Sequence, residues 1–292
     1  MDCKNFRDGE NYCEAGCSLA FTKCSPFCTY YSGSIKGFDS KFMTDIALAS
    51  SSKGNQRKWL VDNYFVKEQF FYQGRFWQDN LVEVIASTIG DSFKEYAQIV
   101  KYKPCVIKDN RIITEGCYSE NFCNDGEKFI SFKRVLNLKH QGFDEYLDYK
   151  DKFKFILNFY NKMTTEDCTD YLCTMIILDY LVGNEDRHLN NFGFIENDGV
   201  LKKAPLFDFG LGLFEHDCKY EGEKFKECLK LMQCKPFSKD NQIITDWVLE
   251  NYWQHDLPTS VDLSGCVIPS VNAATYLRNR FMHLGISLEG VD

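Results

Sequence analysis

The chain has 292 residues, of which 44% are hydrophobic, 15% aromatic and 26% charged, and its net charge is −8. This composition is that of a folded globular protein and excludes a disordered chain, and the length suffices for one large domain or two lobes that share a core. The acidic balance argues against a nucleic-acid-binding protein and against docking on anionic lipid, because both functions need a basic face.

The N-terminal stretch MDCKNFRDGENYCEAGC lacks the apolar segment of a secretory signal. The longest apolar stretch runs from Leu172 to Leu178, far short of the roughly 20 residues that a membrane span needs. We therefore expect a cytoplasmic protein without a membrane span. In that compartment its 14 cysteines are expected to be reduced thiols or metal thiolates.

Residues 1–34 form a Cys-rich arm that ends in YYSGS and holds five of the cysteines. Four of the five follow the spacing C-x3-C-x6-C-x3-C, which can place four thiolates around a tetrahedral zinc ion. These candidate zinc ligands are Cys13, Cys17, Cys24 and Cys28. The alternative is a set of buried small apolar residues or of incidental thiols, because a regular C-x2-C pair would be stronger evidence of a metal site.

A strand-rich segment, residues 35–117, is expected to form the first of two lobes. Its extended, β-branched and aromatic stretches predict strands: FMTDIALA, KWLVDNYFVKEQFF, AQIVKYKPCVI and RIITEGCY. The small polar loop SSSKGNQR separates the first two. The stretch QDNLVEVIASTIG predicts a short helix with Asp79 or Asn80 as its N-cap and Gly90 at its end.

Residues 118–292 carry mainly helical patterns and are expected to form the second lobe. DEYLDYKDKFKFILNFYNKM predicts an amphipathic helix, and 168–182 a buried helix that Thr164 caps together with Asp167 and that Gly183 closes. FGFI-ENDG-VLKK predicts a hairpin with an Asn-Asp-Gly turn, and DNQIITDWVLENYWQ a further helix. Strands followed by helices predict an α+β protein of two lobes.

The loop GNEDRHLNNFGF, residues 183–194, holds more charged and amide side chains than a simple turn needs. Asp186 and Asn191 lie five residues apart in it, and the expected hairpin returns the chain to Asp208 in APLFDFG. Phosphoryl transfer needs a carboxylate that orients the acceptor hydroxyl, and an amide oxygen and a second carboxylate that hold Mg²⁺. The sequence therefore predicts Asp186 as the base and Asn191 and Asp208 as Mg²⁺ ligands of an ATP-dependent kinase.

The N-terminal half offers candidates for binding the phosphates of ATP. Residues 50–58 lie between two expected strands, where their backbone N–H groups can face phosphate. Lys67 lies on the next strand, the usual place of a phosphate-binding lysine with a catalytic role, and Glu83 in the following helix is its expected partner. Asp79, one turn earlier, is the less favoured partner.

These residues resemble the HipA-like family of bacterial kinases over about residues 45–215. The family's loop Gly-x-Gln-x-Lys is similar to Gly54-Asn55-Gln56-Arg57-Lys58, and its catalytic Asp-x-His-x-x-Asn is similar to Asp186-Arg187-His188-Leu189-Asn190-Asn191. Asp-Arg-His followed by Asp-Phe-Gly is also similar to the phosphoinositide lipid kinases, which share the fold. The segment GNEDRH…NFGF…APLFDFG most resembles the small, secreted or free-standing HipA-like kinases.

The resemblance implies a bilobal protein-kinase-like fold that transfers the γ-phosphate of ATP to a Ser or Thr hydroxyl of a protein. The candidate nucleotide-binding residues are Ser51, Ser52, Gly54, Gln56, Lys58, Lys67, Glu83, Glu115, Cys117 and His188. For His188, a hydrogen bond to a backbone carbonyl that orients the loop ranks above proton transfer. Ser51 lies three residues before Gly54, as the family's loop serine does, and is the predicted site of self-phosphorylation.

The sequence departs from the family at two places. The Cys-rich arm stands where full-length HipA toxins have an N-terminal subdomain, which leaves pairing with a DNA-binding antitoxin open. Asn184 stands where typical protein kinases have His.

Two alternatives are a lipid or small-molecule kinase and a nucleotide-binding pseudokinase. The mixed charges of LGLFEHDCKYEGEKFKECLK lack the basic cluster that a phosphoinositide site needs. The presence of Lys67, Asp186, Asn191 and Asp208 argues against a pseudokinase, which usually lacks at least one of them.

Overall fold

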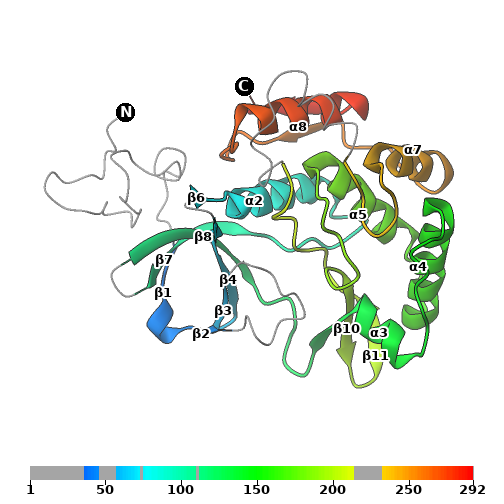
Figure 1. Cartoon of the computed structure of the whole chain (residues 1–292), viewed down its shortest axis with the longest axis horizontal. Helices are drawn as coiled ribbons and strands as arrows, with labels where there is room; N and C mark the ends of the chain where they lie inside the picture. Colours follow the sequence, from blue (N-terminus) through cyan, green and yellow to red (C-terminus); the bar gives the residue numbers. More distant parts are fainter. Residues whose placement is uncertain (1–35, 46–56, 73–74, 110–111, 214–231, 292) are drawn as a thin grey trace, which may run out of the picture.

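The computed structural model describes residues 36–45, 57–72, 75–109, 112–213 and 232–291. Figure 1 shows strands β1 to β8 on one side of the molecule and most of the helices on the other. This arrangement confirms the predicted α+β class with a β-rich N-terminal part and an α-rich C-terminal part. The Cys-rich arm and most of the expected phosphate loop, including Ser51, Ser52, Gly54 and Gln56, lie outside the described residues.

The N-terminal part is built on a six-stranded sheet with the strand order β1-β7-β8-β4-β3-β2. β1 and β7 run parallel, and the other neighbours are antiparallel. The strands are β1 (Lys36–Asp39), β2 (Thr44–Asp45), β3 (Lys58–Val61), β4 (Tyr64–Glu68), β7 (Lys103–Asp109) and β8 (Ile112–Glu120). A small separate hairpin pairs β5 (Phe71–Tyr72) with β6 (Arg75–Phe76).

Three of the expected strands differ from the structure. Of AQIVKYKPCVI only the part from Lys103 onward lies in a strand, β7. The stretch KWLVDNYFVKEQFF is a hairpin of β3 and β4, because the chain turns at Asp62, whose φ is 48°. Asp tolerates this left-handed conformation better than most residues, so Asp62 favours a turn. The alternating hydrophobic pattern did not indicate that turn. In FMTDIALA, which begins at Phe42, the first residue ends the short 3₁₀ helix η1 (Ser40–Phe42), and only β2 is a strand within the described part.

Helix α2 (Asp79–Gly90) lies between the sheet and the helices of the C-terminal part (Figure 1). Eleven of its 12 residues are buried, as a helix in contact with both parts requires. Its N-cap is Gln78, not the expected Asp79 or Asn80, because the Asp79 carboxylate accepts a hydrogen bond from Phe70 N (3.1 Å) instead. Gly90 ends the helix as predicted, but with a right-handed φ of −59° that leads into η2 (Asp91–Phe93).

The C-terminal part begins with a strand, so its first helix starts later than the pattern at residue 118 predicted. A three-stranded sheet has the order β11-β10-β9, and β12 and β13 form a parallel pair. These strands are β9 (Lys128–Ser131), β10 (Gly193–Asn197), β11 (Val200–Lys203), β12 (Ser260–Asp262) and β13 (Ser287–Glu289). The helices are α3 (Phe132–Leu138), α4 (Tyr149–Thr164), α5 (Thr169–Val182), α7 (Asn241–Asn251) and α8 (Val271–His283).

Helix α5 is the centre of the core. Twelve of its 14 residues are buried, and apolar side chains surround it on all sides. The structure confirms Gly183 as its end, with a φ of 63°. Thr164 does not cap it: Thr164 is the last residue of α4, and its hydroxyl donates to Tyr160 O (2.9 Å). The N-cap of α5 is Cys168.

The β10–β11 hairpin is confirmed, and it determines where Asp208 lies relative to α5. Asp198 and Gly199 have φ values of 50° and 82°, as a two-residue turn between twisted strands requires. Residues 204–208 then return toward the end of α2, and Leu206 N donates to Gln98 O (2.8 Å).

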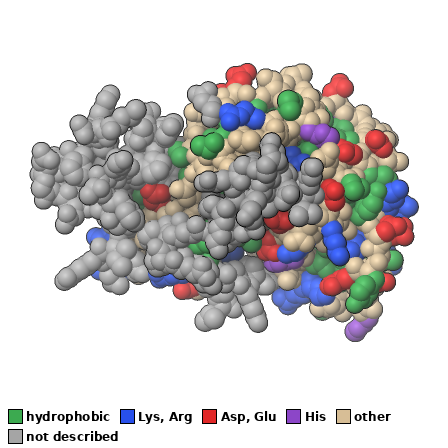
Figure 2. All heavy atoms as spheres, turned by 45° about the horizontal axis from the view of Figure 1, so that its top comes forward, with side chains coloured by type: hydrophobic (Ala, Val, Ile, Leu, Met, Phe, Trp, Pro, Cys, Tyr) green, Lys and Arg blue, Asp and Glu red, His purple; other side chains and the backbone are tan. Residues whose placement is uncertain are grey.

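The described surface is of mixed character. On the face in Figure 2, hydrophobic side chains are scattered among basic and acidic ones wherever the described part is visible. No helix among the described residues combines the length and the apolar character that crossing a bilayer needs.

Candidate active site

The loop between α5 and β10 presents one carboxylate at the surface and buries one amide. Asp186 Oδ1 lies 3.3 Å from Lys235 Nζ, and the Asp186 side chain is 31% exposed. Asn191 Nδ2 donates to Asp186 O (3.0 Å), so the amide is fixed by the backbone of the residue that carries the carboxylate. Asn191 Oδ1 is buried and accepts no hydrogen bond within the described residues. A buried amide oxygen without a partner is an oxygen donor available to a cation.

The second group of site residues joins the sheet, α2 and the Asp-Phe-Gly segment. Lys67 Nζ on β4 donates to Glu83 Oε1 on α2 and lies 2.8 Å from Asp208 Oδ1. Glu83 Oε2 also accepts a hydrogen bond from Phe209 N (3.0 Å). The predicted Lys67–Glu83 pair therefore exists, and the same glutamate fixes the backbone that follows Asp208. Asp79, the less favoured partner, accepts a hydrogen bond from Phe70 N (3.1 Å).

Asp208 itself has a left-handed backbone, with φ of 65°. A non-glycine residue rarely adopts this conformation, and such residues are concentrated at functional sites. Lys58 Nζ lies 3.9 Å from Asp208 Oδ1, so two lysines surround this carboxylate. Both Lys58 and Lys67 come from the β3–β4 hairpin, where they face each other in the register.

Electrostatics keep Lys67 and Asp208 ionised. Burial favours the neutral form of Lys67, but the carboxylates of Asp208 and Glu83 outweigh it and hold the pKa of Lys67 well above its usual value. Burial likewise disfavours the charged form of Asp208, but Lys67 and Lys58 outweigh it and hold the pKa of Asp208 well below its usual range. A charged ammonium and a charged carboxylate at neutral pH are the states that phosphate and Mg²⁺ binding need.

A buried arginine connects the loop between α5 and β10 to the segment directly before Asp208. Arg187 donates from Nε and Nη2 to the carboxylate of Asp179 on α5, at distances of 2.9–3.3 Å. Its Nη1 donates to Asn191 O (2.9 Å) and to Phe207 O. The guanidinium also lies over the ring of Phe209, 4.5 Å from its centroid. Arg187 thus holds three parts of the site at fixed positions.

The sequence-based reasoning missed the other members of this buried network and the lysine beside Asp186. Asn184 Nδ2 donates to Asp179 Oδ1 (2.8 Å), where typical kinases have a histidine in place of Asn184. The sequence did indicate a special role for Asp179, since it is the only acidic residue in the second half of an otherwise apolar helix. Lys235 lies 49 residues from Asp186 in the sequence, and no local pattern connects them.

The structure places the remaining predicted residues as follows. Cys117 on β8 is buried and paired with Lys67 in the β4–β8 register, and burial raises the pKa of its thiol. Glu115 also lies on β8, and its backbone carbonyl accepts from Gln69 N (2.9 Å). His188 does not bond a carbonyl: its Nδ1 accepts from Asn190 N (3.3 Å), and its Nε2 lies 3.8 Å from Asp186 Oδ2. Its contacts place it with Asp186 and Asn190 in the catalytic loop.

The oxygen donors fit Mg²⁺. This ion prefers carboxylate and amide oxygens and takes few ligands from the protein, since phosphates and water complete its shell. The buried Oδ1 of Asn191 and the ionised carboxylate of Asp208 are such ligands. Among the described residues, His, Cys, Asp and Glu side chains form no cluster of three or more that could hold a metal. The four cysteines predicted to bind zinc lie outside those residues.

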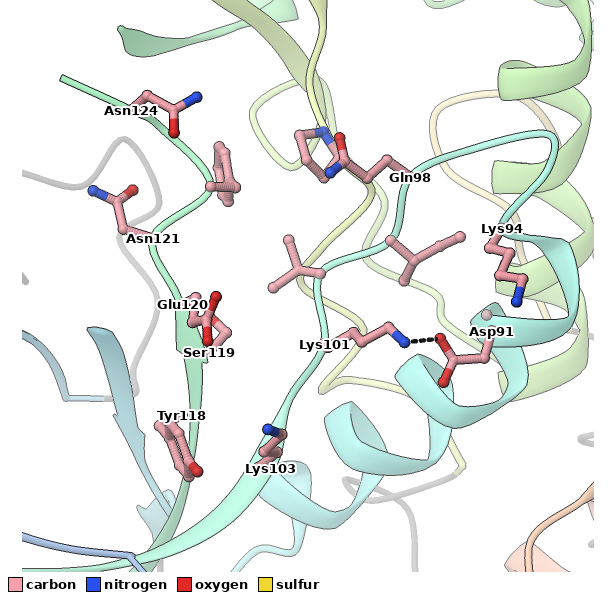
Figure 3. A pocket seen from close by; sticks show the side chains of 15 residues that line it. Asp91, Lys94, Gln98, Lys101, Lys103, Tyr118, Ser119, Glu120, Asn121 and Asn124 are labelled. Atoms are coloured by element: carbon pink, nitrogen blue, oxygen red, sulfur yellow. Dashed lines mark ion pairs between the residues drawn. The ribbon is translucent and has the colours of Figure 1, made fainter. Parts of the chain in front are cut away.

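A cavity of about 480 Å³ lies between the end of β8 and the segment that leads into β7. Figure 3 shows Lys101 and Asp91 at one side of it, joined by an ion pair of 2.7 Å, and Ser119, Asn121 and Asn124 at the other. No predicted site residue lines this cavity. It is therefore separate from the candidate active site.

Comparison with known proteins finds one matching family model. Residues 125–248 match the model of the HipA-like C-terminal domain, a range that runs from just before β9 into α7 and includes Asp186, Asn191 and Asp208. This match supports the resemblance to HipA-like kinases that the sequence motifs predicted.

Two solved structures are similar to the chain. The Helicobacter pylori proinflammatory kinase CtkA has 15% sequence identity and a TM-score of 0.52, over 85% of this chain and 95% of CtkA. At this identity the likeness shows a shared fold. HipA of Shewanella oneidensis, from a toxin–antitoxin complex with HipB and operator DNA, has 12% identity and a TM-score of 0.41. That match spans 80% of this chain and 56% of HipA. No curated protein sequence matches the chain.

Proposed function

We propose that the chain is an ATP- and Mg²⁺-dependent kinase that phosphorylates a Ser or Thr hydroxyl of a protein. The observation that carries the proposal is the position of Lys67, held by Glu83 and Asp208 at the point where the sheet, α2 and the Asp-Phe-Gly segment meet. In kinases this lysine–glutamate pair positions the phosphates, and the Asp-Phe-Gly carboxylate holds the metal. A structural ion pair would not need the left-handed Asp208 or the unpartnered Asn191 Oδ1 beside it.

Each side chain has a role in the proposed reaction. Lys67 would bind the phosphates of ATP, and Asn191 and Asp208 would hold Mg²⁺, which when bound supplies positive charge beside the transferring phosphoryl group. Asp186 accepts a hydrogen bond from the acceptor hydroxyl and takes its proton. The acceptor oxygen forms a bond to the γ-phosphorus while the bond from that phosphorus to the bridging oxygen breaks, and ADP leaves.

The loop arrangement separates the two kinds of carboxylate that this mechanism needs. Asp208 is surrounded by lysines and is fixed as an anion, which suits a metal ligand. Asp186 is partly exposed, so an acceptor can reach it. Arg187, which is paired with the buried Asp179, donates to both Asn191 O and Phe207 O and so links the loop of Asp186 to the segment before Asp208. We further propose that the protein acts in the cytoplasm and that residues 35–117 and 118–292 form its two lobes.

The test uses two variants that separate metal binding from transfer. Asp208→Ala should abolish Mg²⁺-dependent turnover of γ-labelled ATP, because the metal loses its charged ligand. Asp186→Ala should bind ATP like the parent and fail to transfer phosphate. Asp170→Ala, a partly exposed carboxylate on α5, is the matched control. Turnover in both site variants at the rate of the parent would overturn the assignment, and mass spectrometry of the labelled product identifies the acceptor residue.

A further inference from the structure

A second cavity, of about 840 Å³, adjoins the catalytic loop on the side of Asp186. Its lining comes from the catalytic loop itself, the start of α3, the segment that leads into α4, and residues 233–239. His188 and Lys235 belong to this lining, and both also approach the Asp186 carboxylate, at 3.8 Å and 3.3 Å. The cavity is therefore a groove that ends at the proposed base. We call it the acceptor groove.

The acceptor groove is basic although the chain is acidic. Four lysines line it against two carboxylates, in a protein whose net charge is −8. The lysines are Lys133, Lys152, Lys235 and Lys239, and the carboxylates are Glu145 and Asp148.

Most of this positive charge has no partner of its own. Among the described residues, Lys133, Lys152 and Lys239 form no ion pair, and Lys235 pairs only with Asp186. Asp148 caps α4, since its carboxylate accepts from Asp151 N (2.9 Å), so one of the two acids is already engaged. Within the described residues, Lys133, Lys152 and Lys239 therefore carry charges that an anionic ligand can pair with.

The groove also offers apolar contact beside the charges. Tyr146 lines the groove and is 98% exposed, so its ring is accessible to a ligand. Phe143 is half-buried, packs against Phe155 at 5.7 Å between ring centroids, and presents a fixed edge to the groove. Aromatic residues next to charged ones suit a peptide, because a peptide presents both apolar and charged side chains.

We propose that the acceptor groove binds the phosphoacceptor and selects an acidic peptide, in which Asp or Glu residues flank the Ser or Thr that reaches Asp186. The proposal rests on the proposed kinase function. The carboxylates of the peptide pair with Lys133, Lys152 and Lys239 along the groove. Glu145 and the capping Asp148 would repel the continuous phosphate backbone of a nucleic acid, which favours a peptide with separated charges.

The first experiment measures binding without turnover. The probe is a fluorescent 13-residue peptide with one central Ser and Glu at its flanking positions, and its matched forms have Gln or Lys at those positions. Fluorescence anisotropy with the Asp208→Ala full chain should give affinities in the order Glu, Gln, Lys. Exposed ion pairs each contribute roughly a two- to fivefold gain in affinity, so we expect about a tenfold difference between the Glu and Gln peptides.

Charge-reversal variants locate this preference. A triple variant with Lys133→Glu, Lys152→Glu and Lys239→Glu should bind the Glu peptide at least tenfold more weakly than the parent does. It should bind the Lys peptide more tightly than the Glu peptide. The control, Lys103→Glu with Lys108→Glu and Lys202→Glu, makes the same change in net charge at exposed lysines outside the groove. It should keep the preference of the parent.

The outcomes distinguish this proposal from the proposed function. Equal affinity for the three peptides, or an equal loss in the groove and control variants, overturns the acceptor groove even if ATP is turned over. Selective binding of the Glu peptide without any phosphate transfer by the parent chain overturns the kinase function and leaves the groove supported. A single-stranded RNA probe that binds more tightly than the Glu peptide, through the same three lysines, overturns the choice of a peptide.

Discussion

The Asp179→Asn substitution would leave the guanidinium of Arg187 buried without a carboxylate. Both side chains are almost completely inaccessible, with exposures of 0% for Arg187 and 1% for Asp179. The substitution keeps the size of the side chain and an oxygen that can accept from Asn184, so the main loss is the charge. Breaking a buried ion pair from one side costs about 3–5 kcal/mol, because the remaining charge has lost its solvation and its partner.

This free energy corresponds to a large thermal shift. At roughly 3 °C per kcal/mol for a chain of this size, the Tm should fall by about 10 °C. The assay is thermal and urea unfolding followed by circular dichroism. Asp170→Asn is the control, since this carboxylate lies on the same helix but is 42% exposed and pairs with His255 at the surface. Its unfolding free energy should change by less than about 1 kcal/mol.

A double variant separates the unpaired charge from the loss of the pair. Asp179→Leu with Arg187→Met removes both charges and should recover part of the stability that Asp179→Asn loses, because no charge is left buried alone. It should not recover phosphate transfer, since the hydrogen bonds from Arg187 to Asn191 O and Phe207 O are gone. If Asp179→Asn and Asp170→Asn unfold at the same temperature, the claim that this pair holds the loop is wrong.

Four further predictions concern other parts of the molecule. Gly116→Ala should destabilise the chain by about 1–3 kcal/mol in urea unfolding. A Cβ there would meet the backbone of Lys67 and lie 2.8 Å from Ile107 Cδ1. The control is Gly142→Ala, whose Cβ would meet nothing within 4 Å and which should leave the stability unchanged. The folded pKa of Asp208 lies below its unfolded value of about 3.9, so ionised Asp208 contributes stability above that pH that is lost as the pH falls. Asp208→Asn should therefore flatten the acid side of the stability curve, measured by urea unfolding between pH 6 and pH 3. If the Cys-rich arm binds zinc, about one equivalent should co-purify and leave with Cys13→Ser and Cys17→Ser, and metal analysis that finds far less excludes the site. Phosphopeptide mapping after incubation with ATP should find phosphate on Ser51, and a Ser51→Asp variant should bind ATP poorly, because the added negative charge repels the ATP phosphates.

The sequence was sufficient where local patterns determine structure. The Gly183 helix end and the Asn-Asp-Gly hairpin could be recognised because each depends on residues close together in the chain, whereas the roles of Asp186, Asn191 and Asp208 stay predictions. The β3–β4 turn was missed because Asp62 and Asn63 interrupt an alternating pattern without a glycine or proline. The cap of α2 was missed because Asp79 bonds to Phe70, a contact between segments that no pattern records.

Contacts between residues far apart in the chain position the site, so residues outside its motifs are needed to build it. Lys67 and Asp208 lie 141 residues apart, and Lys235 and Asp186 lie 49 apart, so only the folded core brings each pair together. Helix α5 positions the loop of Asp186. The helix is buried on all sides and presents one carboxylate, Asp179, near the end where that loop begins. That carboxylate fixes Arg187, and Arg187 fixes the backbone on both sides of the site. The loop of Asp186 and the Asp-Phe-Gly segment are therefore joined through a buried ion pair, of which Arg187 belongs to the sequence motif and Asp179 does not.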